Sequence, residues 1–284
     1  VVIYARLPEP GTVGDPRTMD VCGLTANSAD LQRFGARGVD TGALNSYWFN
    51  GCTSWLDFGG SRVVIDYFVK QFVQYGAAKP TGELGAVTQT GSTEKVCTKS
   101  IVLVDGNSLQ IEVKGSGQPL CDIAQVAGER AHAVLTEKQI PRRTEPWPED
   151  SLANADACSL LKPENLVVQL KAEATPYPWN ELGSWGCGWD YDQRHVQIEF
   201  SRQQPFDSND GTVIDAGRDK LAYLDPEQDE GVCQVKIQQR VAGEGDEKRI
   251  EVVRVILSED KLTEGTSLCP GATELAKAVV PRLP

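Results

Sequence analysis

Short stretches of the chain alternate between hydrophobic and polar residues, and they occur in the same order twice. In the first half, RVVIDYFV begins at Arg62 and VCTKSIVLV begins at Val96. In the second half, HVQIEF begins at His195 and VCQVKIQQRV begins at Val232. A period of two is typical of a β-strand with one buried face, and Gly-Gly-Ser, Asp-Gln-Arg and Asp-Gly-Asn beside such stretches favour tight turns. The pattern predicts two hairpins in each half.

Each half also contains two segments that are typical of helices. Pro163 and Glu164 suit a first helical turn, where a missing N–H costs nothing and a carboxylate meets the positive end of the helix dipole. In the first half, Ser28 or Thr25 is the expected N-cap. A closing helix begins at the last cysteine of each half, in CDIAQVAGERAHAVLTEKQI and CPGATELAKAVVPRL.

The order of helix, two hairpins and helix predicts an α+β fold. We expect two tandem repeated modules, each an antiparallel sheet of about four or five strands with helices on one face, stapled by disulfides. The first module covers residues 1–145, where VVIYARLP adds an edge strand or a stalk, and the second covers residues 146–284. The boundary falls in RRTEPWPEDSLANADA, which is rich in proline and charge.

Cysteine landmarks support the repeat. DVCGL from Asp20 and DACSL from Asp156 share the pattern Asp-x-Cys-x-Leu. A Gly-Cys pair then precedes Trp55 in the first half and Trp189 in the second, and we expect both tryptophans to pack in a core. Four cysteines occur in the same order in each half. One of these matches can arise by chance, but the ordered set indicates a duplication.

The repeat narrows the disulfide pairing. Eight cysteines allow 105 connectivities, but like modules should pair internally and alike. We expect Cys22–Cys52, Cys97–Cys121, Cys158–Cys187 and Cys233–Cys269. Pairing of the first with the fourth cysteine and the second with the third in each module stays open as an alternative. Disulfides in this number are typical of an extracellular or other oxidising compartment.

The scaffold motifs resemble a known group of proteins. The Asp-x-Cys-x-Leu opening, the Gly-Cys-x-Trp element and a closing Cys-x-x-Ala helix resemble small extracellular domains of actinobacterial cell-envelope lipoproteins. They are also similar to external sensor domains of certain actinobacterial receptor kinases. The resemblance covers most of both modules and implies binding at the envelope rather than catalysis. The sequence departs from the lipoprotein pattern because it has no lipidated cysteine at its start.

Charge and motifs exclude several functions. Lys and Arg number 28 against 40 Asp and Glu, a net charge of −12, which disfavours nucleic acids and anionic membrane surfaces. No apolar run approaches the roughly 20 residues of a transmembrane helix, so we expect membrane attachment only through N-terminal residues that precede this sequence. No nucleotide or dinucleotide fingerprint and no close Cys or His pair is present, so we expect no cofactor and no metal.

One catalytic hypothesis stays open. Asp40 lies in Asp-Thr-Gly, and Asp215 lies in Asp-Ala-Gly. Aspartic proteases use two carboxylates that share one proton and come from matching loops of two halves. The repeat does not align Asp40 with Asp215, and no hydrophobic strand leads into Asp40. A polar turn at each position is the simpler interpretation.

Aromatic residues provide the main hint of a binding surface. They gather in proline-rich or polar loop sequence and comprise Trp48, Phe49, Trp147, Tyr177, Trp179 and Trp185. Large rings in such segments either pack between the modules, which we favour, or bind a ligand.

The sequence therefore favours a secreted or envelope-anchored, non-catalytic binding protein. Its partner is an unknown protein or small-molecule ligand. An aspartic-type hydrolase that uses Asp40 and Asp215, and a sensor or spacer ectodomain of a larger membrane protein, are the alternatives.

Overall fold

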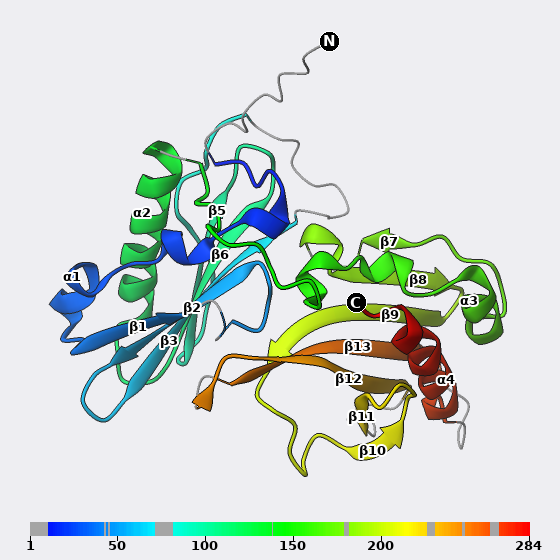
Figure 1. Ribbon diagram of the computed structural model, residues 1–284. Helices are drawn as coiled ribbons and strands as arrows, with labels where there is room; N and C mark the ends of the chain where they lie inside the picture. The colour runs from blue at the N-terminus through cyan, green and yellow to red at the C-terminus, as the bar shows by residue number, and fades with distance from the viewer. Residues whose placement is uncertain are drawn as a thin grey trace. The chain divides into compact units, whose positions relative to one another are not determined.

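The computed structural model describes residues 11–42, 44, 46–71, 82–137, 139–178, 182–225, 231–245, 248–261 and 267–284. The chain forms two compact units, Val1–Pro146 and Trp147–Pro284, a division within one residue of the expected boundary. The residues of VVIYARLP lie outside the described part of the chain. Both units are built mainly of antiparallel sheet (Figure 1).

The first unit contains a six-stranded sheet in the order β1-β2-β3-β6-β5-β4. Its strands are β1 (Gly38–Gly42), β2 (Gly51–Asp57), β3 (Arg62–Lys70), β4 (Thr88–Ser92), β5 (Val96–Val102) and β6 (Ser108–Lys114). Its helices are α1 (Ser28–Leu31), α2 (Leu120–Glu137) and the 3₁₀ turns η1 (Pro16–Thr18), η2 (Val21–Leu24) and η3 (Gln32–Phe34).

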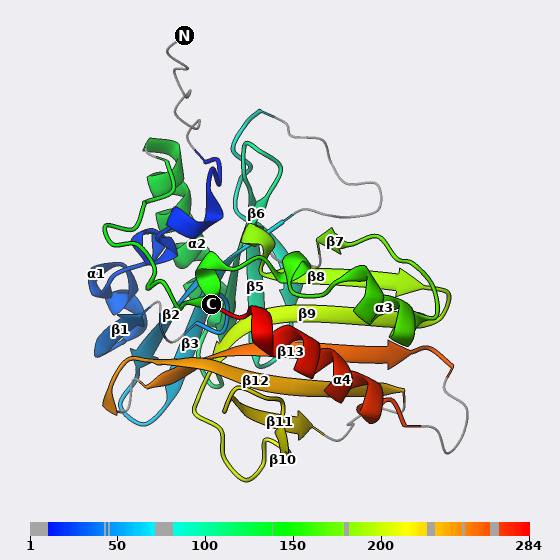
Figure 2. The same ribbon diagram turned by 45° about the vertical axis from the view of Figure 1, so that its right-hand side comes forward.

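The second unit contains a seven-stranded sheet in the order β10-β11-β12-β13-β9-β8-β7 (Figure 2). Its strands are β7 (Tyr177–Pro178), β8 (Gly186–Tyr191), β9 (Arg194–Gln203), β10 (Thr212–Asp215), β11 (Leu221–Asp225), β12 (Val232–Ala242) and β13 (Arg249–Glu259). Its helices are α3 (Pro163–Leu170), α4 (Cys269–Val279) and the 3₁₀ turns η4 (Leu152–Asn154), η5 (Ala157–Ser159), η6 (Leu182–Ser184) and η8 (Val280–Arg282).

The two sheets share their central topology. The order β2-β3-β6-β5 in the first unit matches β8-β9-β13-β12 in the second, strand for strand along the chain. These are the two hairpins that the sequence predicts in each half. The expected number of four or five strands was too low, because β1, β4, β7, β10 and β11 extend the edges. β1, β4, β7 and β10 are short and mostly polar or exposed, so hydrophobic alternation does not mark them. β11, LAYLD, is largely hydrophobic but only five residues long.

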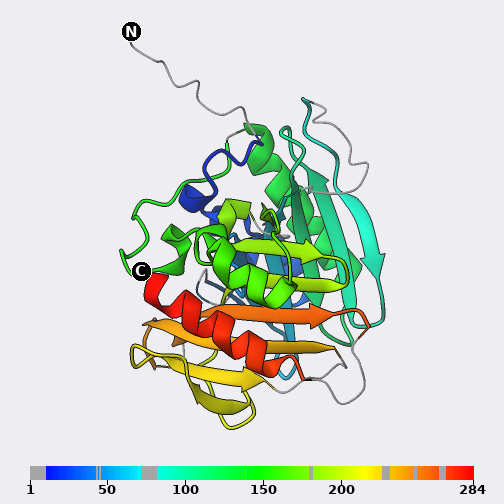
Figure 3. The same ribbon diagram turned by 90° about the vertical axis from the view of Figure 1, so that its right-hand side faces the viewer.

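The closing helices pack on the central strands. Helix α2 contacts β5 and β6. Helix α4, red in Figure 3, contacts the matching strands β12 and β13. On β3, Val63, Ile65 and Tyr67 are fully buried, whereas the intervening residues are only half-buried. One face of the sheet therefore belongs to the core, and the opposite face is called the outer face below.

The Asp-x-Cys-x-Leu motif forms a capped turn in both units. The Asp20 carboxylate accepts the Cys22 N–H at 3.1 Å, and the Asp156 carboxylate accepts the Cys158 N–H at 2.9 Å. The motif's leucine is buried in each case. The aspartate satisfies a backbone donor that the short 3₁₀ turn leaves without a partner. The sequence motif thus fixes the turn that presents the first cysteine of each module.

The four disulfides are Cys22–Cys52, Cys97–Cys121, Cys158–Cys187 and Cys233–Cys269. This is the pairing that the repeat predicts, and it leaves no free cysteine. In each unit the first disulfide joins the capped turn to the first central strand, which is β2 or β8. The second disulfide joins the start of the closing helix to β5 or β12.

The first helix of each unit is only partly as expected. Helix α3 begins at Pro163 with Glu164 in its first turn, as predicted. In the first unit the predicted caps Ser28 and Thr25 are wrong, because Asn27 is the N-cap and accepts two backbone N–H bonds. Asparagine and serine are equally good N-cap residues, so the residue types alone could not show whether the helix is capped by Asn27 or by Ser28.

The two ends of the first unit are held together by backbone bonds. Met19 and Arg142 form an isolated antiparallel bridge. Beside it, the Asp20 N–H donates to the Pro141 carbonyl at 2.7 Å. The segment that leads into the sheet therefore pairs with the segment that follows α2.

In the second unit, one side chain joins the first segment to the last. The Gln239 amide on β12 donates to the carbonyl of Asp150 at 3.1 Å and to that of Pro284. Nearby, the buried Glu251 carboxylate accepts the Ser151 hydroxyl at 2.9 Å and the Leu152 N–H at 2.8 Å. A buried carboxylate is stable when it accepts several hydrogen bonds, so Glu251 anchors the start of this unit to β13.

Candidate functional site

A hollow of about 400 Å³ lies on the outer face of the first sheet. Side chains of β2, β3 and β6 and of the loop before β2 line it: Ser46, Tyr47, Trp48, Thr53, Trp55, Val64, Asp66, Phe68, Glu112 and Lys114. Ligand sites in proteins are typically concave, rich in aromatic side chains, and equipped with a few polar groups. This hollow, called the outer-face hollow below, has that composition.

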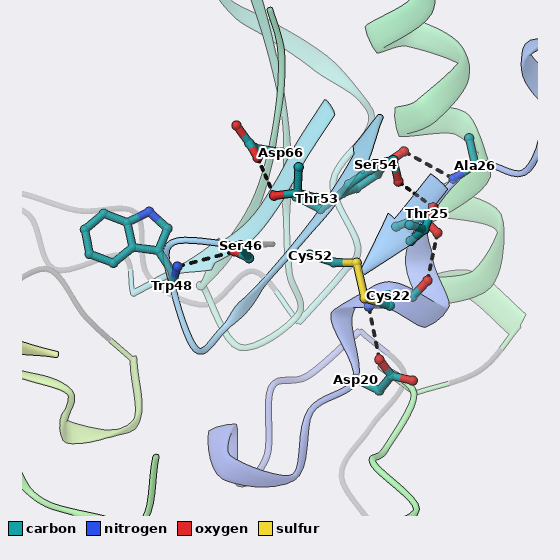
Figure 4. The surroundings of a disulfide bond; sticks show 12 residues. Asp20, Cys22, Thr25, Ala26, Ser46, Trp48, Cys52, Thr53, Ser54 and Asp66 are labelled. Carbon is teal, nitrogen blue, oxygen red and sulfur yellow. Dashed lines mark hydrogen bonds between the residues drawn. A yellow bond between two sulfur atoms is a disulfide. The ribbon is translucent and has the colours of Figure 1, made fainter. Parts of the chain in front are cut away.

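The loop before β2 is pinned where its side chains reach the hollow. Gly51 leaves room for it, since a Cβ there would lie 2.2 Å from the Ser46 hydroxyl oxygen. Ser46 is buried and accepts the Trp48 N–H at 3.3 Å (Figure 4). The Asn50 side chain donates to the Val69 carbonyl, and the Val69 N–H donates back to the Asn50 carbonyl at 3.2 Å. The position of Trp48 is therefore fixed by the strands beneath it.

Aromatic rings form much of the wall. The Arg62 guanidinium lies 4.9 Å from the centre of the Trp55 ring, and the Lys70 ammonium lies 5.1 Å from the centre of the Phe68 ring. Each cation is attracted by the negative face of its ring and restricts the ring's orientation. Trp55 is only half-buried, so part of its indole remains accessible.

A short polar network forms the floor. Asp66 and Glu112 face each other across β3 and β6, where two like charges repel. The Lys114 ammonium bridges them, at 3.3 Å from Asp66 and 2.5 Å from Glu112. The buried Thr53 hydroxyl donates to Asp66 at 2.6 Å (Figure 4). Desolvation lowers the pKa of Lys114, but hydrogen bonds and the charges of both carboxylates outweigh it, so its pKa is raised.

A second hollow of about 240 Å³ shares Trp55 as a wall. Asp40 on β1 lies directly across from Trp55 and lines this second hollow together with Asp57 and Arg62. Trp55 is therefore the common boundary of two adjacent depressions.

The second unit differs at the matching place. In the first unit Gly42 on the edge strand faces Thr53, whereas in the second Tyr177 faces Gly188. A Cβ on Gly188 would lie 2.6 Å from the Tyr177 ring, so the ring covers this glycine. The Tyr177 hydroxyl also donates to Asp190 at 2.7 Å, which holds the ring in place. A small residue faces threonine in one unit and a large ring faces glycine in the other.

Part of the second outer face is a ladder of paired polar groups. The Arg254 guanidinium donates to Glu199 at 2.9 Å and to the Gln234 side-chain oxygen at 2.9 and 3.2 Å. The Gln234 amide donates to Asp225 at 2.7 Å, and the Lys236 ammonium lies 3.0 Å from the same carboxylate. The ladder crosses β9, β13, β12 and β11.

Trp55 and Trp189 lie on opposite faces of their sheets. Trp189 is two residues after Cys187 and 1% exposed, so it shares the buried face with that cysteine. Trp55 is three residues after Cys52, and one extra residue in a strand turns the side chain to the other face. The expectation of a core role is confirmed for Trp189 and wrong for Trp55.

The predicted aromatic residues do not form one surface. Trp48 lines the outer-face hollow, but its neighbour Phe49 is 5% exposed. Trp185 is fully buried, and its indole N–H donates to the Ala153 carbonyl at 3.0 Å. The Arg202 guanidinium lies 5.6 Å from the Trp147 ring centre. Tyr177 covers Gly188, and Trp179 lies outside the described residues.

Asp40 and Asp215 occupy strands that do not correspond. Both residues are exposed. Asp40 is on β1, the edge strand beside the first central strand of its sheet, whereas Asp215 is on β10, the edge strand farthest from the first central strand of the other sheet. Asp215 accepts the Gly217 N–H at 2.8 Å in a local turn. The interpretation of GVDTGA as a polar turn is wrong, because Gly38–Gly42 pairs with β2 as a strand.

No family model, curated protein or solved structure matches this chain. Within the residues that the structure describes, no helix is long and apolar enough to cross a membrane. Within the same ranges, no three His, Cys, Asp or Glu side chains are grouped to hold a metal ion.

Proposed function

We propose that the protein is an extracellular or envelope-associated, non-catalytic binding protein, and that the outer-face hollow is its site for a small-molecule ligand. The hollow itself is the main support: it combines aromatic walls with a bridged pair of carboxylates on the face of a sheet that lies away from the core. Four disulfides are typical of a protein that folds in an oxidising compartment, which agrees with an envelope or secreted location.

The hollow fits binding better than catalysis. Its carboxylates and ammonium are joined in ion pairs, and no histidine lines it. The alternative of an aspartic hydrolase needs two carboxylates that share one proton on matching loops. Asp40 and Asp215 come from strands that do not correspond in the repeat, so this alternative is the weaker proposal. It predicts acid-dependent hydrolysis of a protein substrate that Asp40→Asn abolishes.

Covering the hollow tests the proposal. Gly42→Tyr adds a large ring directly across from Thr53, which lines the hollow. Because Thr53 has a side chain where the second unit has Gly188, the ring cannot lie over its partner strand as Tyr177 does and takes up space at the hollow instead. A library of small metabolites is screened against the unreduced full chain by tryptophan fluorescence and melting temperature. We expect binders whose affinity falls at least about tenfold, a change of about 1.4 kcal/mol, in Gly42→Tyr.

Thr90→Tyr is the matched control, because it adds the same ring to β4, the exposed strand at the other edge of the same sheet. This variant should bind as the wild type does. A library without any binder, or binders that Gly42→Tyr leaves unaffected, would contradict the proposed site.

A further inference from the structure

The chemistry of the outer-face hollow also points to a ligand class. We infer that the ligand is a neutral saccharide, with one sugar ring stacked on Trp55 and its hydroxyls bonded to Asp66, Glu112 and Lys114. This inference rests on the proposed binding function and goes beyond it, because the hollow alone does not specify what binds.

Trp55 provides a flat apolar platform of the right kind. It is half-buried, it lines the hollow, and the Arg62 guanidinium 4.9 Å from its ring centre restricts its orientation. A pyranose ring has a flat face of C–H groups and a rim of hydroxyls, so it can bury that face against a fixed indole while the rim stays polar. A ring that is already oriented loses little conformational entropy when it binds.

The floor supplies both kinds of hydrogen-bonding partner that vicinal hydroxyls need. Asp66 and Glu112 accept, and Lys114 between them donates. Hydrogen bonds to charged groups are roughly twice as strong as those between neutral groups. Because the charges already neutralise each other in part, a neutral hydroxyl can join the network without leaving a carboxylate or the ammonium unpaired.

Charged ligands fit the same surroundings less well. A cationic ligand would meet Lys114 on the floor and the cations of Arg62 and Lys70 over the rings. An anionic ligand would meet Asp66 and Glu112 in a chain whose net charge is −12. A charged ligand in the hollow would be repelled by the groups of its own sign, so a neutral polar ligand fits the site best.

The size of the site indicates a short saccharide. About 400 Å³ is near the lower end of ligand pockets, which span roughly 300–1,000 Å³. The second hollow, of about 240 Å³, also has Trp55 in its wall and is lined by Asp40 and Asp57. A disaccharide would place one ring in the outer-face hollow and extend its second ring past Trp55 toward the second hollow.

A defined probe set tests the inference on the unreduced full chain. Glucose, galactose, mannose, xylose, maltose and cellobiose represent neutral saccharides. Tetramethylammonium chloride and glucuronate represent a cation and an anionic sugar. Binding is followed by isothermal titration calorimetry and by tryptophan fluorescence. We expect at least one neutral saccharide to bind, a disaccharide to bind more tightly than its monosaccharide, and the two charged probes to bind at least about tenfold more weakly.

Three variants identify the contact. Trp55→Ala should weaken saccharide binding at least about tenfold, and Trp55→Phe, which retains a smaller ring, should weaken it less. Tyr191→Ala removes an aromatic ring that is 49% exposed in the second unit and should leave binding unchanged. The near-ultraviolet circular dichroism of each variant must match that of the wild type.

The outcomes separate the two proposals. If tetramethylammonium or glucuronate binds, Gly42→Tyr abolishes that binding and neutral saccharides do not bind, the ligand class is wrong but the proposed site stands. If saccharides bind equally well to wild type and Trp55→Ala, the stacking inference is overturned. If no probe binds and the metabolite library also yields no ligand, both proposals fail.

Discussion

The outer faces of the two sheets differ far more than their cores. The buried faces share their strand order, their two disulfides and a capped turn with a buried leucine. On the outer face, the first unit has an aromatic hollow over a three-membered charged floor. The second has a polar ladder and a ring that covers Gly188 on the matching strand.

The difference agrees with how strongly packing constrains each position of the shared strand order. Core positions of a packed sheet contact many neighbours, so a change of volume is costly. Outer-face positions interact mainly with their cross-strand partners, so a pair can change together. Gly42 with Thr53 and Tyr177 with Gly188 are such pairs. In the first unit the small member of the pair is on the edge strand beside the hollow, and in the second unit the large ring there covers Gly188.

The largest expected effect distinguishes the two tryptophans. Trp189→Ala removes a fully buried ring and should lower the free energy of unfolding by about 3–5 kcal/mol. Trp55→Ala removes a half-buried ring from the outer face and should cost about 1 kcal/mol or less. Urea unfolding of the full chain measures both values. Equal losses would mean that Trp55 also supports the core, against its assigned face.

Disulfide removal should affect the two units alike. Cys22–Cys52 and Cys158–Cys187 close loops with sequence separations of 30 and 29 residues. In the chain-entropy model each contributes about 3–4 kcal/mol. The double variants Cys22→Ala/Cys52→Ala and Cys158→Ala/Cys187→Ala should therefore lose similar free energies of unfolding, measured in urea. A difference of more than about 2 kcal/mol would show that the shared scaffold is not equally dependent on these bonds.

Alkaline pH should destabilise the first unit through Tyr67. Burial raises the pKa of Tyr67, whose hydroxyl accepts the Ala26 N–H at 3.1 Å. The neutral form is favoured in the fold, so this stability is present below the unfolded pKa of about 10 and is lost as pH rises above it. The loss should be about 1.4 kcal/mol per pH unit.

Urea unfolding between pH 9 and pH 11.5 measures this slope. Tyr67→Phe should flatten it, at a cost of about 1 kcal/mol at neutral pH for the lost hydrogen bond. Tyr191→Phe, at a residue that is 49% exposed, is the control and should retain the wild-type slope. The matching residue of the second unit is Ile198, which does not ionise. An unchanged slope in Tyr67→Phe would rule out Tyr67 as the source.

The smallest effects should come from the outer-face cations. Arg254→Met breaks the polar ladder, and Lys114→Met breaks the floor of the hollow. Both side chains are partly exposed, so each change should alter stability by about 1 kcal/mol or less. Calorimetric titration should nonetheless separate them, because only Lys114→Met should weaken saccharide binding. Equal losses of affinity would place the ligand outside the outer-face hollow.

The shared scaffold could be predicted from the sequence because its landmarks are local and repeated. Asp-x-Cys-x-Leu, the Gly-Cys pair and the Val-Cys pair each mark a short segment, and their order repeats. The edge strands could not be predicted in this way. TQTGS in β4 is exposed at every position, so no hydrophobic alternation distinguishes it from a loop. Its pairing with β5 depends on tertiary structure rather than on its own side chains.

Only part of the candidate site could be predicted. Trp48 could be identified from the polar loop that contains it. The different face of Trp55 could also have been predicted, because Trp55 follows its cysteine by three residues and Trp189 follows its cysteine by two. The charged floor required more information. Asp66 and Lys114 are 48 residues apart, and the pairing of β3 with β6 brings them together. No local pattern specifies that register.

The closed ends of each unit have a consequence for how such proteins evolve. In the first unit Met19 pairs with Arg142, and in the second Gln239 binds carbonyls near both ends of the unit. A unit whose first and last segments lie side by side can be joined to a neighbouring chain segment at one place on its surface. Its coding segment can be copied or deleted in frame without stretching the chain or opening a core.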